Sequence, residues 1–207
     1  MADYYRVPFV SPRCRLDAFE CLALDIETTG LHPAHDQILS IGYTRVADGC
    51  LQLAPRRHDL VRPSIAVPET SAVTHGILDD RAATGIGLRD ALDPLLEALA
   101  GRVLLAHHAA IEHGFLDRAC RRMFGCPFVV PVIDTLALER RALSRANRVA
   151  SPGSLRLAAL RTRYGLPRYR AHDALGDAIG VGELLLAQLA HRSDADTLRL
   201  ADLAWRP

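Results

Sequence analysis

Strand and turn signals meet in one short stretch, Leu24-Asp25-Ile26-Glu27-Thr28-Thr29-Gly30. An apolar run from Cys21 leads into this stretch and Thr-Thr-Gly closes it, so we expect a buried strand that ends in a sharp turn. Because side chains alternate along a strand, Asp25 and Glu27 should share one face of the sheet. The rest of the fold is predicted outward from this strand.

Two carboxylates held side by side repel each other unless a proton or a cation lies between them. Hard divalent cations prefer oxygen ligands, so a metal site is one interpretation of Asp25 and Glu27. The alternative is an edge strand with a solvated acidic face. Further carboxylates at buried positions later in the chain would favour the metal site.

The composition is typical of one globular domain. The chain has 207 residues, of which 49% are hydrophobic and 24% charged, which suffices for a core and argues against disorder. The net charge is +1, and all 25 basic residues are arginine. Twelve of these lie between Arg118 and Arg170, where the acids are Asp134 and Glu139. This excess of guanidinium groups suits phosphate binding, and solvated helix faces are the alternative.

Cysteine usage and the N-terminus bear on the compartment. The five cysteines are scattered and include no Cys-x-x-Cys pair, which indicates free thiols in a reducing environment. Charged residues from Asp3 to Arg15 argue against a signal peptide. No apolar run approaches the roughly eighteen residues that a membrane span needs. We therefore expect a cytoplasmic protein with no membrane partner.

The order of elements predicts an α/β fold. After the opening strand, residues 37–46 and 51–60 should form two more strands of an antiparallel meander, joined by a turn at 47–49. Strands and helices then alternate, which implies a mixed sheet flanked by helices. The other expected elements are a loop with a short helix at 63–86, strands at 102–106 and 128–134, and helices at 88–99, 109–124, 135–146, 154–163 and 173–192.

These elements divide the chain into three parts. Residues 1–19 are expected to be an irregular lead-in that packs across the body, and residues 20–192 the main domain. Residues 193–207 are expected to form a tail with a short helix packed on that domain.

Two later carboxylates should face the sheet. Helical residues advance about 100° each, which places Glu112 on the same side as Phe115 and Leu116. Asp117 falls on the solvent side, where the i+4 spacing favours an ion pair with Arg121.

The last long helix repeats this arrangement. Asp177 shares a face with Ala174 and Val181, so it too should point inward near the helix start. His172 lies five residues earlier, in the loop from which an imidazole can reach over the site. A buried carboxylate is costly unless it is paired or bound to a metal, and pairing with arginine is the alternative for each acid.

Four motifs follow one another along residues 20 to 190. The first is Asp-x-Glu-Thr-Thr-Gly at 25–30, followed by Val73-Thr74-His75-Gly76-Ile77. The next runs from Ala106 to Leu116 and contains His-His-Ala-Ala-Ile-Glu; the last, at 171–178, has a His-x4-Asp spacing. In this order they resemble the DEDDh family of 3′→5′ exonucleases, the ribonuclease H-like group that includes the proofreading ε subunit of bacterial DNA polymerase III and ribonuclease T.

The chain departs from the family pattern at two positions. Glu112 stands where the family usually has Asp, and Asp173 stands where it usually has Asn. Because a glutamate reaches a cation from a backbone about one methylene further back, we interpret Glu112 as a functional replacement.

The resemblance implies a ribonuclease H-like five-stranded sheet and a metal-dependent hydrolase. Two Mg²⁺ or Mn²⁺ ions would be held by four carboxylates, Asp25, Glu27, Glu112 and Asp177. His172 would be the general base that takes the proton of the attacking water. The terminal sugar and base would lie among Thr28, Thr29, Gly30, His75 and Ile77.

The substrate implied is the 3′ end of single-stranded nucleic acid, with DNA favoured over RNA and nucleoside 5′-monophosphates released. A polymerase is a candidate partner, although the chain ends soon after its last helix, which favours a stand-alone exonuclease. The sequence leaves the oligomeric state open.

Two other functions are consistent with parts of the pattern. The stretch Leu24-Asp25-Ile26-Glu27-Thr28 is similar to the Asp-x-Asp-x-Thr start of haloacid-dehalogenase-like phosphatases, but that chemistry needs a second Asp at the position of Glu27 and a lysine, and the chain has no lysine. The other alternative is a catalytically weak module that binds nucleic-acid 3′ ends, suggested by Glu112. His172 favours the enzyme, because a pure binder needs no general base.

Overall fold

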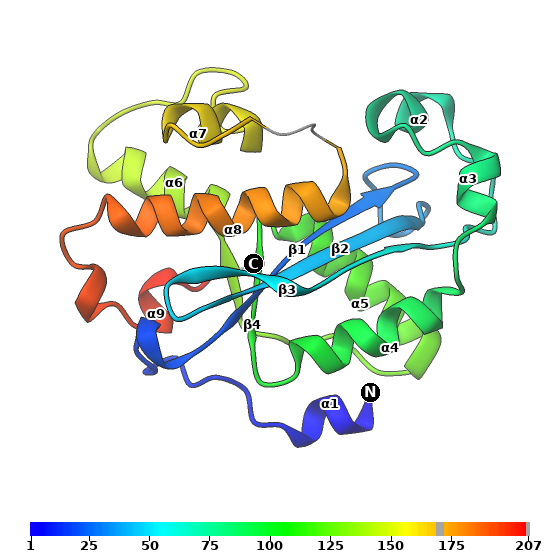
Figure 1. The fold of residues 1–207 in the computed structure, drawn as a ribbon, viewed down its shortest axis with the longest axis horizontal. Helices are drawn as coiled ribbons and strands as arrows, with labels where there is room; N and C mark the ends of the chain where they lie inside the picture. The colour runs from blue at the N-terminus through cyan, green and yellow to red at the C-terminus, as the bar shows by residue number, and fades with distance from the viewer. Residues whose placement is uncertain (169–171, 206–207) are drawn as a thin grey trace.

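Five strands form one mixed sheet in the computed structural model, which describes residues 1–168 and 172–205 (Figure 1). The strand order is β3-β2-β1-β4-β5, antiparallel from β3 to β1 and parallel from β1 to β5. The strands are β1 (Cys21–Thr28), β2 (Ile38–Ala47), β3 (Cys50–Leu60), β4 (Val103–Ala106) and β5 (Val132–Asp134). The predicted α/β class, with a meander followed by parallel strands, is confirmed.

Helices flank the sheet and connect its parallel strands. They are α1 (Ala2–Arg6), α2 (Glu69–His75), α3 (Asp79–Ala83), α4 (Leu88–Leu99), α5 (Ala110–Phe124), α6 (Thr135–Arg145), α7 (Leu157–Arg163), α8 (Ala174–Ala190) and α9 (Leu200–Leu203). Within the described ranges, every helix is too short or too polar to cross a bilayer.

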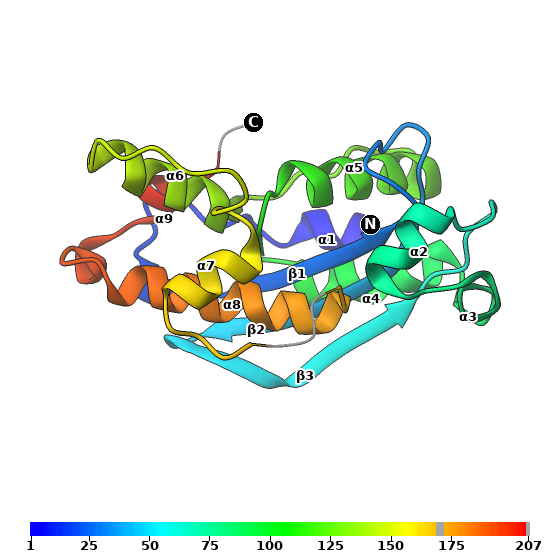
Figure 2. The same cartoon turned by 90° about the horizontal axis from the view of Figure 1, so that it is seen from above.

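The strand β1 separates two hydrophobic clusters. Leu22 and Leu24 pack with α4 and α5 on one face, whereas Ala23 packs with α8 on the other. Figures 1 and 2 show α8 lying along the strands, with α4 and α5 across the sheet from it. Since side chains alternate, Asp25 and Glu27 continue the α8 face. The predicted alternation therefore holds, and it places both acids beside α8.

Several elements differ in length from the sequence-based expectation. The strand expected at 128–134 is reduced to β5, because Pro127 and Pro131 have no N–H to donate to a sheet. The helix expected from residue 154 begins at Leu157, after a turn at Gly153 with a φ of 75°. The 63–86 region holds two short helices, α2 and α3, instead of one.

Both end segments bind the stretch that leads into β5. The lead-in was expected to be irregular, but it contains α1, whose Tyr4 is buried and donates a hydrogen bond to the Val129 carbonyl at 2.9 Å. Burial of apolar and aromatic side chains favours this short helix, although little of the remaining segment is helical. The tail forms α9, and the Trp205 N–H donates to the Val132 carbonyl at 2.8 Å.

The start of α8 lies directly on β2 at Gly42. A Cβ at this position would sit 2.2 Å from the Ala174 carbonyl carbon and from the Leu175 nitrogen. Real Cβ atoms do not approach backbone this closely, so only glycine permits the contact. At Gly182, further along α8, a Cβ would instead meet the end of the Leu51 side chain at 2.5 Å.

We expect Gly42→Ala to lower the free energy of unfolding by more than about 2 kcal/mol, because the helix backbone has to move away from the sheet. Gly182→Ala is the matched control and should cost less than about 1 kcal/mol, since the Leu51 side chain can rotate and alanine favours the helix. Urea unfolding of both variants measures the difference. Equal stabilities would contradict the close contact at Gly42.

Candidate active site

Two carboxylates lie at the carboxyl end of the central strand β1. Glu27 is 9% exposed and Asp25 is partly buried. Glu27 pairs with Ser40 of β2, and the register then shifts, so that Thr28 pairs with Ile38. This irregularity ends the regular strand just beyond the second acid. The sequence reasoning that placed both acids on one face thus agrees with the structure.

The helix α5 brings Glu112 to the same place. Glu112 lies in the first turn of α5 and is 4% exposed, and its Oε2 has no hydrogen-bond partner within residues 1–168 and 172–205. Burial raises the pKa of Glu112 to about 8, and the Asp134 charge adds to this, against a backbone hydrogen bond that lowers it. Asp117 instead binds Arg121 at 2.8 Å, as its spacing predicted.

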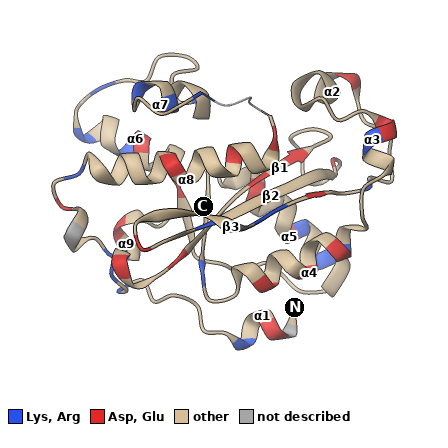
Figure 3. Cartoon of the chain, in the orientation of Figure 1, with Lys and Arg blue, Asp and Glu red and all other residues tan. Residues whose placement is uncertain are grey.

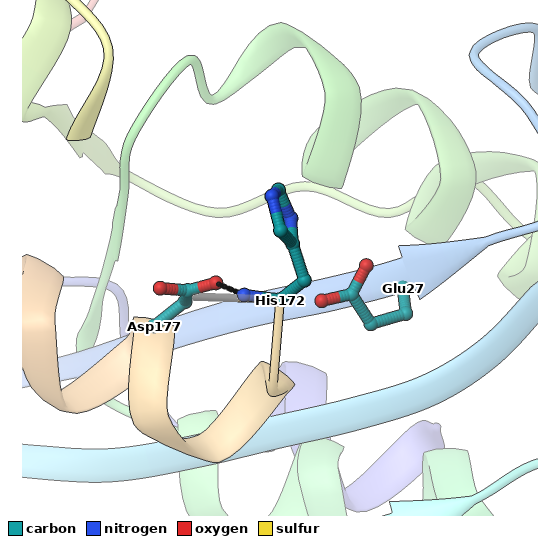
Figure 4. A group of neighbouring side chains, drawn as sticks. All are labelled: Glu27, His172 and Asp177. Carbon is teal, nitrogen blue, oxygen red and sulfur yellow. Dashed lines mark hydrogen bonds between the residues drawn. The ribbon is translucent and has the colours of Figure 1, made fainter. Parts of the chain in front are cut away.

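The N-terminus of α8 adds Asp177 and His172. The His172 backbone N–H donates to Asp177 Oδ2 at 2.8 Å, and His172 has a φ of 65°, in the left-handed region. Figure 4 shows the His172 side chain standing between Glu27 and Asp177. One ligand atom from each of these three residues lies within 4.8 Å of the others. The last of the four predicted motifs therefore meets the first, although its Ala171 lies outside the described residues.

Every one of the four carboxyl groups has a raised pKa. For Asp25 the causes are burial first, and then the charges of Glu112, Asp177 and Glu27. Burial, followed by repulsion from Asp177, raises the pKa of Glu27 to about 7. Burial also raises the pKa of Asp177, although the His172 backbone N–H partly offsets it. The site thus holds more negative charge than its surroundings stabilise.

This donor set fits divalent cations. It offers carboxylate oxygens, which hard cations prefer, and one of them, Glu112 Oε2, is buried with no hydrogen-bond partner among the described residues. None of the four acids forms an ion pair with an arginine in the described chain. Pairing with arginine was the alternative for each acid, so the geometry favours a metal site.

A cavity of about 580 Å³ opens beside Glu27 and His172. Its lining includes His75 and Ile77 of the predicted substrate loop, but not Thr28, Thr29 or Gly30. His75 Nδ1 accepts the Ile77 N–H at 3.1 Å, and burial lowers the pKa of His75. Ile77 is 3% exposed and packs with Leu39.

The three turn residues serve the local structure. The Thr29 hydroxyl binds Asp36 and accepts the Gln37 N–H at 3.0 Å, and the Thr28 hydroxyl donates to the Gly30 carbonyl. A Cβ at Gly30 would sit 2.5 Å from the Asp36 carboxylate. These contacts fix the turn that follows the two catalytic candidates.

Asp134 is a buried acid that the sequence reasoning did not assign to the site. It is 3% exposed, and its carboxylate accepts three backbone N–H groups, from His108 at 2.9 Å, Ala109 at 3.2 Å and Leu136 at 2.9 Å. It thereby caps α6 and holds the segment that leads into α5 and Glu112. An acid directly before Thr135 at a helix start was the available signal.

His58 was also missed, because nothing in its local sequence marks it. Its Nε2 lies 2.7 Å from Ser40 Oγ, and its Nδ1 lies 3.6 Å from Asp173 Oδ1. Asp173 also caps α8 by accepting the Gly176 N–H at 3.2 Å. Strand β3 is thus linked to the start of α8.

Part of the arginine-rich stretch is structural. Arg161 is 6% exposed and donates to the Gly180 carbonyl at 2.8 Å, Arg163 pairs with Glu139 at 3.1 Å, and Arg141 donates to the Leu203 carbonyl at 2.8 Å. Protein groups engage the guanidinium groups of these three residues, which counts against phosphate binding by them, and phosphate binding by the rest of the stretch stays a prediction. The partners of Arg141, Arg161 and Arg163 are distant in the sequence, whereas Arg121 pairs with Asp117 on its own helix, as the spacing predicted.

Comparison with known proteins agrees with this geometry. A family model described as Exonuclease (RNase_T) matches residues 22–185. The chain is 30% identical over 165 residues to the PolC-type DNA polymerase III of Thermotoga petrophila, and 31% identical over 177 residues to a DNA polymerase III subunit epsilon-like protein of Rhodobacter capsulatus. These matches cover 80% and 84% of this chain, but only 11% and 24% of those proteins.

Solved structures share the fold. E. coli exonuclease I in complex with a 5cy-dT13 oligonucleotide has a TM-score of 0.73 and 18% identity, covering 89% of this chain and 42% of that one. The nuclease domain of 3′hExo, a DEDDh family member bound to rAMP, has a TM-score of 0.70 and 17% identity, covering 87% and 94%. Together with the family match, these findings show that the chain belongs to the DEDDh, DnaQ-like exonuclease family and is related to the proofreading domains of PolC and ε.

Proposed function

We propose that this chain is a metal-dependent 3′→5′ exonuclease that releases nucleoside 5′-monophosphates from single-stranded nucleic acid. The observation that carries the proposal is the meeting of Asp25, Glu27, Glu112 and Asp177, all with raised pKa values, beside His172. Family membership supports phosphodiester hydrolysis as the reaction.

The four carboxylates would hold two Mg²⁺ or Mn²⁺ ions. When bound, these cations supply positive charge that stabilises the attacking and leaving oxygens of an in-line displacement. Glu27 and Asp177 approach from β1 and α8, and Glu112 from α5, so the ligands come from three separate elements. A correctly folded core is therefore required before the set is complete.

His172 is proposed as the general base. Its ring nitrogen lies within 4.8 Å of carboxylate oxygens of Glu27 and Asp177, close to where the attacking water would be oriented. Its own backbone N–H is held by Asp177, which fixes the residue at the edge of the cavity. The imidazole would take the water proton and release it to solvent, because His172 is exposed.

The terminal nucleoside would enter the cavity between His172 and α2. His75 and Ile77 line the cavity and would contact the sugar and base, whereas Thr28, Thr29 and Gly30 would shape the turn next to them. The side chain of Ile77 is largely buried, so it would form part of the wall of the subsite.

We favour DNA over RNA as substrate. The relatives are named as DNA polymerase III proteins, and two solved structures of the same fold are complexes with DNA, whereas a third is bound to rAMP. The polymerase names also make a replicative polymerase a candidate partner.

The first test is a time course with matched, 5′-labelled single-stranded DNA and RNA of the same sequence. We expect stepwise shortening in Mg²⁺ or Mn²⁺, none in EDTA, and faster loss of DNA. Asp25→Asn should reduce the rate by about a thousandfold, or about 4 kcal/mol, because it removes a charged ligand while keeping the shape.

Asp93→Asn is the matched control for this test, since Asp93 lies on α4 and pairs with Arg89 at the surface. It should retain the wild-type rate. Full activity in Asp25→Asn would refute the assignment of the site. Metal-dependent binding of 3′ ends without any shortening would instead support the weak binding module.

The raised pKa values also predict how stability depends on pH. With EDTA present, Glu27 (pKa about 7) and Glu112 (pKa about 8) stay protonated in the folded state at pH values where the unfolded chain has released these protons. The free energy of unfolding that these two protonated groups contribute is fully present below about pH 4 and is lost as the pH rises towards 8. We expect Mg²⁺ to raise the melting temperature much more at pH 8 than at pH 5.

The variant Glu112→Gln isolates one of these groups. It cannot ionise, so its metal-free melting temperature should fall less than that of the wild type between pH 5 and pH 8. A difference between the two proteins that stays constant across this range would contradict the raised pKa of Glu112.

A further inference from the structure

The cavity beside the catalytic candidates extends along the edge of the sheet. Its lining includes Arg56 of β3 and Arg81 of α3. His58 pairs with Gly42, and Gly42 with Asp25, so the lining runs outward from the carboxylates across two strands. Arg56 precedes His58 by two residues on β3, so its side chain projects from the same face of the strand. Figure 3 shows basic segments on both β3 and α3.

The guanidinium groups of Arg56 and Arg81 are available to a ligand. Neither has an ion pair or a side-chain hydrogen bond to any part of residues 1–168 and 172–205. Arg57, the neighbour of Arg56, differs in this respect because it pairs with Asp59 at 2.6 Å. Arg57 also projects from the opposite face of β3, as the alternation of side chains requires.

Other cavity-lining groups suit a nucleic-acid strand. Leu53 is 52% exposed, and together with Ile179 it offers an apolar surface to a base or sugar. The two acids of the α8 side are already engaged: Asp173 caps α8 and faces His58, and Glu183 pairs with Arg161 at 2.7 Å. Asp173 and Glu183 thus have partners other than Arg56 and Arg81, which leaves these two guanidinium groups to bind phosphate.

We propose that Arg56 and Arg81 bind phosphates of nucleotides upstream of the terminal one, and that they give the chain its preference for oligonucleotides over shorter esters. This inference rests on the proposed exonuclease function. A planar guanidinium takes two phosphate oxygens at once and does not read the base, so these contacts select for length and not for sequence.

The test compares Arg56→Ala/Arg81→Ala with Arg57→Ala on two substrates. One is a 12-nucleotide single-stranded DNA, and the other is the p-nitrophenyl ester of thymidine 5′-monophosphate, which has no upstream phosphate. We expect the ratio of kcat/KM for the 12-mer to that for the ester to fall about tenfold or more in the double variant. The ratio should stay at the wild-type value in Arg57→Ala.

Binding is measured separately in the Asp25→Asn background, by fluorescence anisotropy of the labelled 12-mer at several salt concentrations. Loss of two phosphate contacts should reduce the slope of log K against log salt by about 1.4, since each contact to a single strand contributes about 0.7. This readout does not require hydrolysis. A wild-type chain that hydrolyses neither substrate would refute the proposed function, and the anisotropy would still decide the role of the arginines.

Three results would overturn the inference. One is an unchanged kcat/KM ratio in the double variant. Another is a loss in Arg57→Ala equal to that in the double variant, which would indicate a general effect of surface charge. The third is an unchanged salt slope.

Discussion

Repulsion among four partly or fully buried carboxylates is the interaction on which the rest of the site depends. Burial raises the pKa of Asp25, Glu27, Glu112 and Asp177, and repulsion adds to it: the charges of Glu112, Asp177 and Glu27 act on Asp25, and that of Asp177 acts on Glu27. Such a cluster opposes folding whenever all four groups are ionised without cations. Binding of divalent cations would therefore serve stability and catalysis at once, because the same charge that neutralises the site would stabilise the reacting phosphate.

The scaffold holds this unfavourable arrangement together through contacts that lie outside it. Gly42 lets the start of α8 lie against β2, and Arg161 binds the Gly180 carbonyl from the other side of the helix. Asp134 uses its carboxylate to anchor the approach to α5. Each contact positions an element that carries a site carboxylate, so the geometry of the site is determined by backbone packing and helix capping.

The two departures from the family pattern have different physical consequences. Glu112 reaches the same cluster as the other acids, and its buried Oε2 accepts no hydrogen bond from the part of the chain that the structure describes. Asp173 keeps the helix-capping role that an asparagine would have, but it adds a charge that raises the pKa values of Asp25 and Glu27. His58 lies opposite this added charge, at 3.6 Å, and links it to Ser40. Asp173 thus connects the start of α8 to the outer strand β3 of the sheet.

Much of the fold and most of the proposed metal ligands followed from the sequence alone. Local periodicity predicted these features. A period of two residues indicated the strands and the alternation around Asp25, and a period of 3.6 residues indicated which way Glu112 and Asp177 face on their helices. The order of strands and helices then indicated a meander followed by parallel strands. Tertiary structure alone decided that Arg141, Arg161 and Arg163 bind protein groups, that Asp134 also holds the segment before α5, and that His58 lies beside Asp173. It also decided that the Thr29 hydroxyl binds within its own turn. These outcomes depend on contacts between residues far apart in the chain or on the path of a turn, so no periodic pattern in the sequence indicates them.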